Sequence, residues 1–134
     1  MVLVDTNVLL DVIEDDPEWG DWSQSRLDAA SVRGALAINA VVYAELSMAY
    51  ERIEDLDAMV RRAGLHHSAI PREALFLAGK ASLQYRRRHG GKTGVLPDFF
   101  IGAHAAVAGM AILTRDPRPF RTYFPTVEIF GADH

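Results

Sequence analysis

Near its N-terminus the chain reads VLVDTNVLLDVI over residues 2–13, and two structural patterns meet in this segment. Residues 2–4 are a short apolar run, which is typical of a buried strand. From Asn7 to Ile13 the apolar residues recur at helical spacing instead. Asp5 stands between the two patterns, where a carboxylate commonly caps a helix by accepting backbone N–H groups. The segment therefore predicts a strand that leads directly into a helix.

The same alternation of short apolar runs and longer helical patterns continues along the chain. Further strands are predicted at residues 36–38, 111–113 and 127–130, with a weaker candidate at residues 67–70. Further helices are predicted at residues 19–32, at residues 56–63, from Pro71 to Arg88, and from Asp98 to Gly109. Because helices separate the strands, we expect an α/β fold with a mostly parallel sheet of about five strands.

The composition is that of an ordinary globular protein. The length of 134 residues is close to the commonest size of one domain, so we expect a single domain over residues 1–134. No segment approaches the ~20 apolar residues that span a bilayer, and the N-terminus lacks the pattern of a secretory signal. The absence of cysteine excludes disulfides and thiolate chemistry. We therefore expect a cytoplasmic protein without a membrane segment.

Four acidic residues lie at a predicted strand end or in the opening turns of the next helix: Asp5, Glu45, Asp98 and Asp116. Three of them have an ordinary structural explanation when taken alone. Asp5 and Asp98 could be helix caps, and Asp116 precedes a proline as turn residues often do. Glu45 has apolar helical neighbours, on a face where an unpaired carboxylate is costly.

The four acids are informative as a set. The carboxyl ends of parallel strands meet at one edge of the sheet, so we expect the four side chains to gather there. Carboxylates that gather in this way repel one another, and a hard divalent cation such as Mg²⁺ or Mn²⁺ relieves the repulsion. A metal held by carboxylates can activate water and neutralise charge on a phosphodiester.

The net charge of −4 at first argues against a nucleic-acid substrate, because basic surfaces usually supply the affinity. Without the four acids, however, the 18 Asp and Glu become 14 and equal the 14 Lys and Arg. Bound cations would largely neutralise these four charges. The overall charge therefore does not exclude RNA.

Four motifs together resemble the PIN-domain ribonucleases, and more narrowly the VapC-type toxins of type II toxin–antitoxin systems: VDTNVLLD at 4–11, YAEL at 43–46, LPD at 96–98 and LTRD at 113–116. The motifs occur in the family order and span nearly the whole chain. The resemblance implies a three-layer α/β/α sandwich, a Mg²⁺ or Mn²⁺ site, and endonucleolytic hydrolysis of RNA, often tRNA or rRNA, that leaves 5′-phosphate and 3′-hydroxyl ends. It also implies a cognate antitoxin protein as partner and a homodimer.

The resemblance also assigns roles to residues. Asp5, Glu45, Asp98 and Asp116 match the acidic quartet of the family, with Asp5 and Asp98 as direct metal ligands and Glu45 acting directly or through water. Three polar residues match those that accompany the quartet and would orient the carboxylates by hydrogen bonds: Thr6, Asn7 and Thr114.

Several basic residues are candidates for contact with RNA. Arg115 flanks Asp116, and its charge and position favour a substrate contact. The run Arg86–Arg88, with His89 and Lys92, could bind phosphates or could complement the dipole at the end of a helix. His104 lies about 120° around the helix from Asp98, so we expect it to be packed or solvent-facing rather than catalytic.

Three other classes of protein were weighed. A haloacid dehalogenase phosphatase needs a second aspartate two positions after Asp5, where this chain has Asn7. A two-component receiver domain expects an acidic pair after the first strand, which is not present. A housekeeping PIN nuclease and a catalytically inactive PIN module that binds RNA or protein both stay open as alternatives.

Overall fold

The computed structural model describes residues 1–90 and 96–131. The strands in these residues form one five-stranded sheet. The strands are β1 (Val2–Val4), β2 (Leu36–Ile38), β3 (His66–His67), β4 (Ala111–Leu113) and β5 (Ile129–Phe130). Their order is β3-β2-β1-β4-β5, and every neighbouring pair is parallel. The predicted parallel sheet of about five strands is confirmed.

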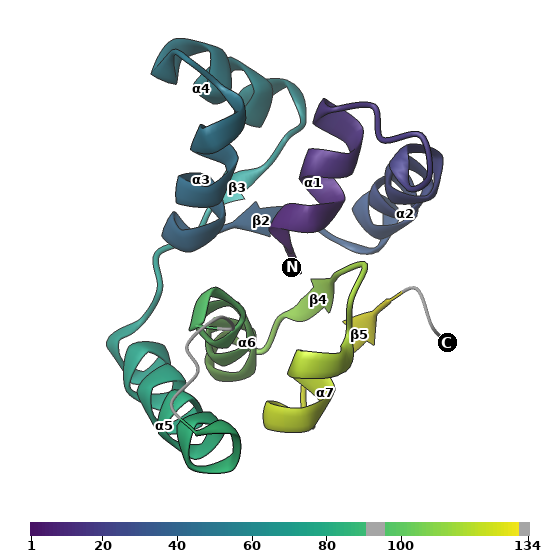
Figure 1. The fold of residues 1–134 in the computed structure, drawn as a ribbon. Coiled ribbons are helices and arrows are strands. Elements are labelled where there is room, and N and C mark those ends of the chain that lie inside the picture. The colour runs from purple at the N-terminus through teal and green to yellow at the C-terminus, as the bar shows by residue number, and fades with distance from the viewer. Residues whose placement is uncertain (91–95, 132–134) are drawn as a thin grey trace.

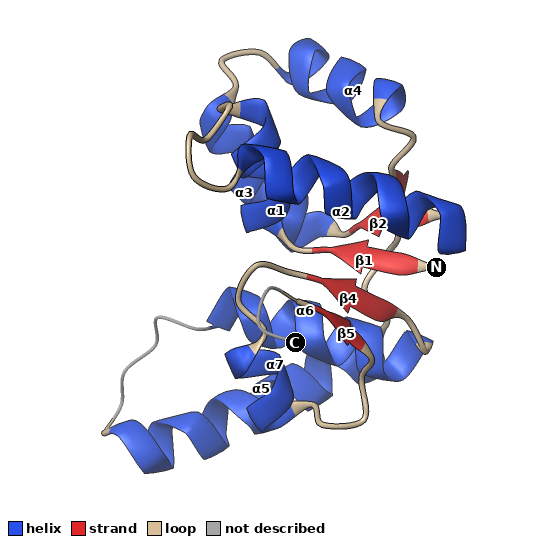
Figure 2. Cartoon of the chain, turned by 90° about the vertical axis from the view of Figure 1, so that its right-hand side faces the viewer, coloured by secondary structure: helices blue, strands red, loops and turns tan. Residues whose placement is uncertain are grey.

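Helices cover both faces of this sheet. They are α1 (Thr6–Ile13), α2 (Gly20–Arg33), α3 (Ala40–Leu46), α4 (Ile53–Arg62), α5 (Arg72–His89), α6 (Leu96–Ala108) and α7 (Arg118–Tyr123), with a short 3₁₀ turn at Ser47–Ala49. Figure 1 shows the elements in chain order, and Figure 2 shows α1–α4 on one side of the sheet and α5–α7 on the other. The α/β/α sandwich is therefore confirmed.

The strand order places the start of the chain at the centre of the molecule. From β1 the chain moves outward through β2 to β3, and it then crosses back to β4 on the other side of β1. Reversal of strand order next to a central strand opens a crevice at the carboxyl ends of the two strands beside it. The residues that follow β1 and β4 therefore meet at this crevice.

The core is apolar and lies on both faces of the sheet. The larger cluster surrounds β1, β2 and β4, whose nine residues are all buried except the half-buried Ala111. A smaller cluster joins α5, α6 and α7 through Phe99, Phe124 and the alanines of α5. None of the described helices combines the length and the apolar character needed to cross a bilayer.

Several predicted boundaries were wrong. Helix α7 was not predicted, because a six-residue segment with two prolines is too short to show helical periodicity and Asp116-Pro117 reads as a turn. Strand β3 lies at His66–His67 rather than at 67–70, and β5 is shorter than 127–130. Helix α6 begins at Leu96, so Asp98 lies in its first turn and not at its start. The basic residue Lys92 lies outside the described residues.

Two glycines differ in the space around them, which gives a test of the packing between α6 and α7. A methyl group at Gly102 in α6 would overlap the ring of Phe124, whereas one at the exposed Gly79 in α5 meets nothing within 4 Å. We predict that Gly102→Ala lowers the free energy of unfolding by about 1–3 kcal/mol. Gly79→Ala should raise it by roughly 0.5–1 kcal/mol, because alanine favours a helix. Urea denaturation of both variants measures this, and equal effects would contradict the packing described.

Candidate active site

Asp5 is a buried carboxylate at the carboxyl end of the central strand. Its side chain is 5% exposed, and each oxygen accepts one hydrogen bond. Oδ1 accepts from the backbone N–H of Thr6 at 2.8 Å, which caps α1, and Oδ2 accepts from the Thr114 hydroxyl at 2.7 Å. Burial raises the pKa of Asp5 to about 6, although these two hydrogen bonds act in the opposite direction. Asp5 is thus both a helix cap and an incompletely compensated buried acid.

Two threonines connect Asp5 to the other acids. Thr6 donates its hydroxyl to Glu45 Oε1 at 2.6 Å, so the residue next to Asp5 holds the glutamate of α3. Thr114, at the end of β4, donates to Asp5 and accepts from the backbone N–H of Asp116 at 3.0 Å. Thr6 and Thr114 therefore make the contacts with acidic residues that the sequence pattern predicted.

Asp98 approaches the same place from the first turn of α6. Burial, together with the negative charges of Asp5, Glu45 and Asp116, raises the pKa of its half-buried carboxyl to about 7. Repulsion from all three of these residues indicates that the four acids share one region. The four acids that the sequence singled out therefore interact electrostatically, and their roles as metal ligands stay predictions.

Asp116 differs from the other three acids because it has a basic partner. Its two carboxylate oxygens accept from Nε of Arg118 at 2.9 Å and from Nη2 at 3.2 Å. The hydrogen bond from the Arg118 side chain lowers the pKa of Asp116. This carboxylate is 45% exposed and stays ionised. The sequence pattern did not predict the Arg118 contact, because it directed attention to Arg115.

The acidic group fits a hard divalent cation in its chemistry, since its ligand atoms would all be carboxylate oxygens and two of its members are protonated more readily than usual. Within residues 1–90 and 96–131, however, no three acidic or histidine side chains lie close enough to form a ready-made metal site. The repulsion between the acids acts at longer distances than those at which side chains share one metal ion. Binding through water, which Mg²⁺ commonly uses, is compatible with both observations.

Arg115 forms an ion pair with an acid outside the quartet. Its Nε lies 3.1 Å from Oδ2 of Asp11 as an ion pair, and its guanidinium lies 5.3 Å from the centre of the Trp19 ring. Its backbone N–H donates to Oδ1 of Asn7 at 3.2 Å. Asn7 and Arg115 therefore tie the loop after β4 to α1, and a substrate contact by Arg115 stays a prediction.

Asp11 is a site residue that the sequence analysis missed. It is 4% exposed and accepts from the Ser23 hydroxyl at 2.8 Å in addition to its ion pair with Arg115. The available signal was the one that drew attention to Glu45, since Asp11 stands among the apolar residues of α1. Its role in the structure is to anchor the segment that carries Asp116.

His104 is buried and packed, as its position on the helix predicted. It is 1% exposed, with Nδ1 3.2 Å from the Asn39 amide nitrogen and Nε2 3.4 Å from the Ser68 hydroxyl. Burial lowers the pKa of His104, so its ring is neutral and can accept from Asn39. Because Asn39 caps α3, this contact connects the helix of Glu45 to the helix of Asp98.

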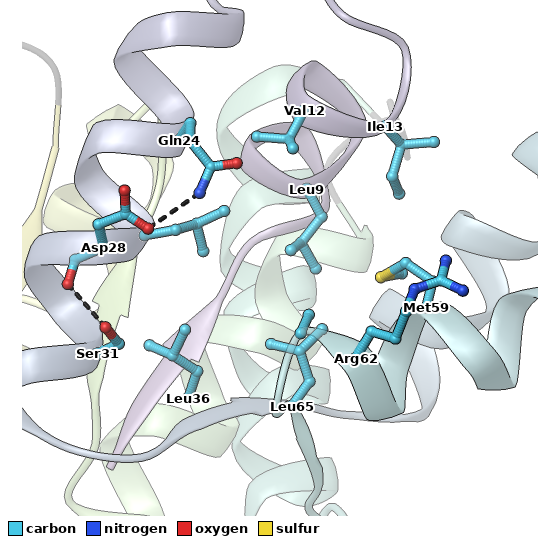
Figure 3. A pocket seen from close by; sticks show the side chains of 12 residues that line it. Leu9, Val12, Ile13, Gln24, Asp28, Ser31, Leu36, Met59, Arg62 and Leu65 are labelled. Atoms are coloured by element: carbon cyan, nitrogen blue, oxygen red, sulfur yellow. Dashed lines mark hydrogen bonds between the residues drawn. The ribbon is translucent and has the colours of Figure 1, made fainter.

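One groove is separate from the acids. It has a volume of about 450 Å³ and lies between α1, α2 and α4. Figure 3 shows the side chains of Leu9, Leu36 and Leu65 pointing into the same space, with Asp28 and Arg62 nearby. A second hollow of about 370 Å³ is lined by Arg115, Asp116, Pro117 and Arg118. The first groove has the apolar lining of a binding surface, and the second belongs to the acidic edge.

Comparison with known families assigns the fold. The PIN-domain model matches residues 2–125. The chain belongs to the PIN-domain family. Among curated protein sequences, none matches this PIN domain.

Solved structures share the same fold. A chain of VapBC2 from Rickettsia felis, bound to a promoter DNA fragment, is 19% identical with a TM-score of 0.72, and the match covers 99% of this chain and 100% of that one. A chain of DNA-bound VapBC from Salmonella typhimurium is 23% identical with a TM-score of 0.68, covering 97% and 96%. A toxin–antitoxin complex from Klebsiella pneumoniae matches at 20% identity and a TM-score of 0.62, covering 95% of each chain.

The raised pKa values predict how the stability of the metal-free protein depends on pH. An acid whose pKa is higher in the folded state stabilises the fold fully below its unfolded pKa and loses that contribution as pH rises through the folded value. Asp5 and Asp98, at about 6 and about 7, should therefore lower Tm between pH 5 and pH 8, by roughly 10 °C.

Two variants separate this effect from other titrations. Asp98→Asn should make the fall of Tm with rising pH less steep and should raise Tm at pH 8, because it removes a charge that repels three others. Asp116→Asn should not, because Arg118 already compensates that charge. Thermal melts in EDTA at pH 5, 6.5 and 8 measure both, and a Tm that rises steadily to pH 8 in the wild type would contradict the charge arrangement.

Proposed function

We propose that this PIN domain is a Mg²⁺- or Mn²⁺-dependent endoribonuclease that acts as the toxin of a toxin–antitoxin pair, with Asp5, Glu45, Asp98 and Asp116 as its metal-binding and catalytic acids. The observation that carries the proposal is the hydrogen-bond network that links three of the acids. Thr6 and Thr114 both donate to Asp5, Thr6 also donates to Glu45, and Thr114 accepts from the backbone N–H of Asp116. A site that concentrates uncompensated negative charge favours a cation, and a carboxylate-bound cation suits phosphodiester hydrolysis.

Each residue of the acidic edge has a distinct part in this proposal. A bound cation would supply a water of lowered pKa and neutralise charge on the scissile phosphate. Asp5 presents its remaining lone pairs in a fixed direction, because Thr6 and Thr114 hold both of its oxygens. Asp98 would be the second direct ligand. Glu45, oriented by Thr6, binds directly or holds a water, and Asp116 completes the set from the other side of Thr114.

The substrate and products follow the family pattern. RNA is the substrate class, with tRNA or rRNA as the expected targets and 5′-phosphate and 3′-hydroxyl ends as the products. The protein would act in the cytoplasm, where these RNAs are found, and as a homodimer.

An antitoxin partner is proposed on two grounds. The similar solved chains come from VapBC and toxin–antitoxin complexes. The groove between α1, α2 and α4 offers an apolar lining with a polar rim, which suits the apolar side of a partner segment. It is lined by none of the four acids, so a partner could anchor there without occupying the site itself.

Substitution at the acidic edge should abolish cleavage without unfolding the protein. We predict that Asp98→Asn reduces metal-dependent cleavage of RNA below detection. Thr114→Val, which removes only a hydroxyl that orients Asp5, should reduce it by roughly 10–100-fold. Asp55→Asn, on the exposed start of α4, is the matched control and should be fully active. Mapping of new 5′-phosphate ends in cellular RNA measures the activity, and full activity of purified Asp98→Asn would refute the proposal.

The partner groove can be tested separately from catalysis. We predict that expression of the wild type alone arrests growth and that a small protein encoded nearby rescues it. Met59→Glu, within the groove, should keep toxicity and lose rescue, because a charge in the apolar lining disfavours the partner. Val32→Glu, on a side chain of α2 that is 87% exposed, should be rescued like the wild type. Equal rescue of both variants would place the partner elsewhere.

A further inference from the structure

A groove between α5 and α7 has no part in the acidic edge. It has a volume of about 440 Å³. Its polar lining consists of Lys80, Gln84 and Arg87 from α5 and Tyr123 from α7, and aliphatic side chains of α5 complete it. The groove therefore combines two cations, an amide and an aromatic ring.

The charge around this groove is unusual for a chain with a net charge of −4. Residues 74–97 contain five Lys and Arg and no Asp or Glu. Lys80 and Arg87 are exposed, and neither forms an ion pair with any acid in residues 1–90 and 96–131. The dipole of α5 accounts for cations in its last turn, but Lys80 lies in the middle of the helix. Cations left without acidic partners are available to an anionic ligand.

Tyr123 adds a fixed aromatic surface. Its ring packs edge-on against Phe99 at 4.9 Å and against Tyr85 at 6.2 Å, measured between ring centres, so neighbours on two helices hold its orientation. Tyr123 is half-buried and lines the groove. Bases of single-stranded RNA stack on such rings while basic side chains bind the backbone.

The groove lies close to the acidic edge along the chain and in space. Phe99, which packs against Tyr123, directly follows Asp98, and α7 begins two residues after Asp116. Figure 2 shows α5 extending past the sheet on the side toward which β1 and β4 point, which is the side of Asp5 and Thr114. A strand of RNA cut at the acids could therefore continue along α5.

We propose that the groove between α5 and α7 binds a single-stranded segment of the RNA substrate, with Lys80 and Arg87 on its phosphates and Tyr123 against a base. This proposal rests on the proposed ribonuclease function and names the surface that supplies its affinity. Such a surface is needed because the acidic edge itself repels phosphate when no cation is bound.

Direct binding separates this proposal from catalysis. The probe is a fluorescently labelled single-stranded oligoribonucleotide of about 10 nucleotides. Its affinity for the full-length protein is measured by anisotropy in EDTA at several salt concentrations. The groove variant is Lys80→Glu with Arg87→Glu. The control is Arg52→Glu with Arg61→Glu, which makes the same charge change at exposed positions at the start and end of α4, on the other side of the sheet.

The groove variant should bind about 10–100-fold more weakly than the control. The slope of the logarithm of its binding constant against the logarithm of salt concentration should be shallower by about 1.4, because two phosphate contacts are lost. Tyr123→Leu should weaken binding by roughly 5–100-fold, whereas Tyr123→Phe should bind like the wild type because the ring remains.

Three results would overturn the proposal. The first is that the wild type does not bind the probe. The second is that the groove variant binds with an affinity within twofold of the control. The third is that the groove variant changes its oligomeric state and keeps its affinity, which would make the groove a protein interface. Metal-dependent cleavage by the wild type is assayed separately, so failure of the ribonuclease function would be seen independently of RNA binding.

Discussion

The rest of the structure depends on the burial of one carboxylate, Asp5, at the carboxyl end of the central strand. A buried ionised group is costly unless hydrogen bonds or an opposite charge compensate it. The described residues supply two hydrogen bonds to it, and its pKa remains raised. The compensation is thus partial, which leaves a place for a cation. The donors, Thr6 and Thr114, belong to α1 and to the end of β4, so satisfying Asp5 also joins these two segments.

The topology turns this local requirement into a site. Because β2 and β4 both pair with β1, the loop after β4 meets the turn after β1 at the point where the strand order reverses. Thr114 and the Asn7 contact fix that loop, and the Asp11–Arg115 ion pair anchors it to α1. Helices α3 and α6 bring Glu45 and Asp98, and the contact between Asn39 and His104 keeps the two helices together. A single position thus collects acids from four separate parts of the chain.

The parts of this arrangement that could be predicted from sequence are those encoded in local patterns. The apolar runs gave three of the strands, and the recurring position of acids after strands gave the quartet. The sequence could not reveal what depends on contacts between distant segments, such as the Asp11–Arg115 pair. It also missed α7, whose six residues are too few for a periodic signal, and with it the Arg118 partner of Asp116. The ion pair of Arg115 with Asp11 in α1 was likewise not predicted, because the two residues are far apart in sequence.

The central claim is that the four acids form a cation site in which Asp5 and Asp98 hold protons more readily than usual when no cation is bound. Isothermal titration calorimetry with Mn²⁺ in buffers of different ionisation enthalpy tests it most directly, because it counts the protons released on binding. With pKa values of about 6 and about 7 for Asp5 and Asp98, binding at pH 6.5 should release about one proton, and binding at pH 8.5 almost none. Asp98→Asn should lose most of this release. Absence of Mn²⁺ binding, or binding without proton release at pH 6.5, would contradict the account.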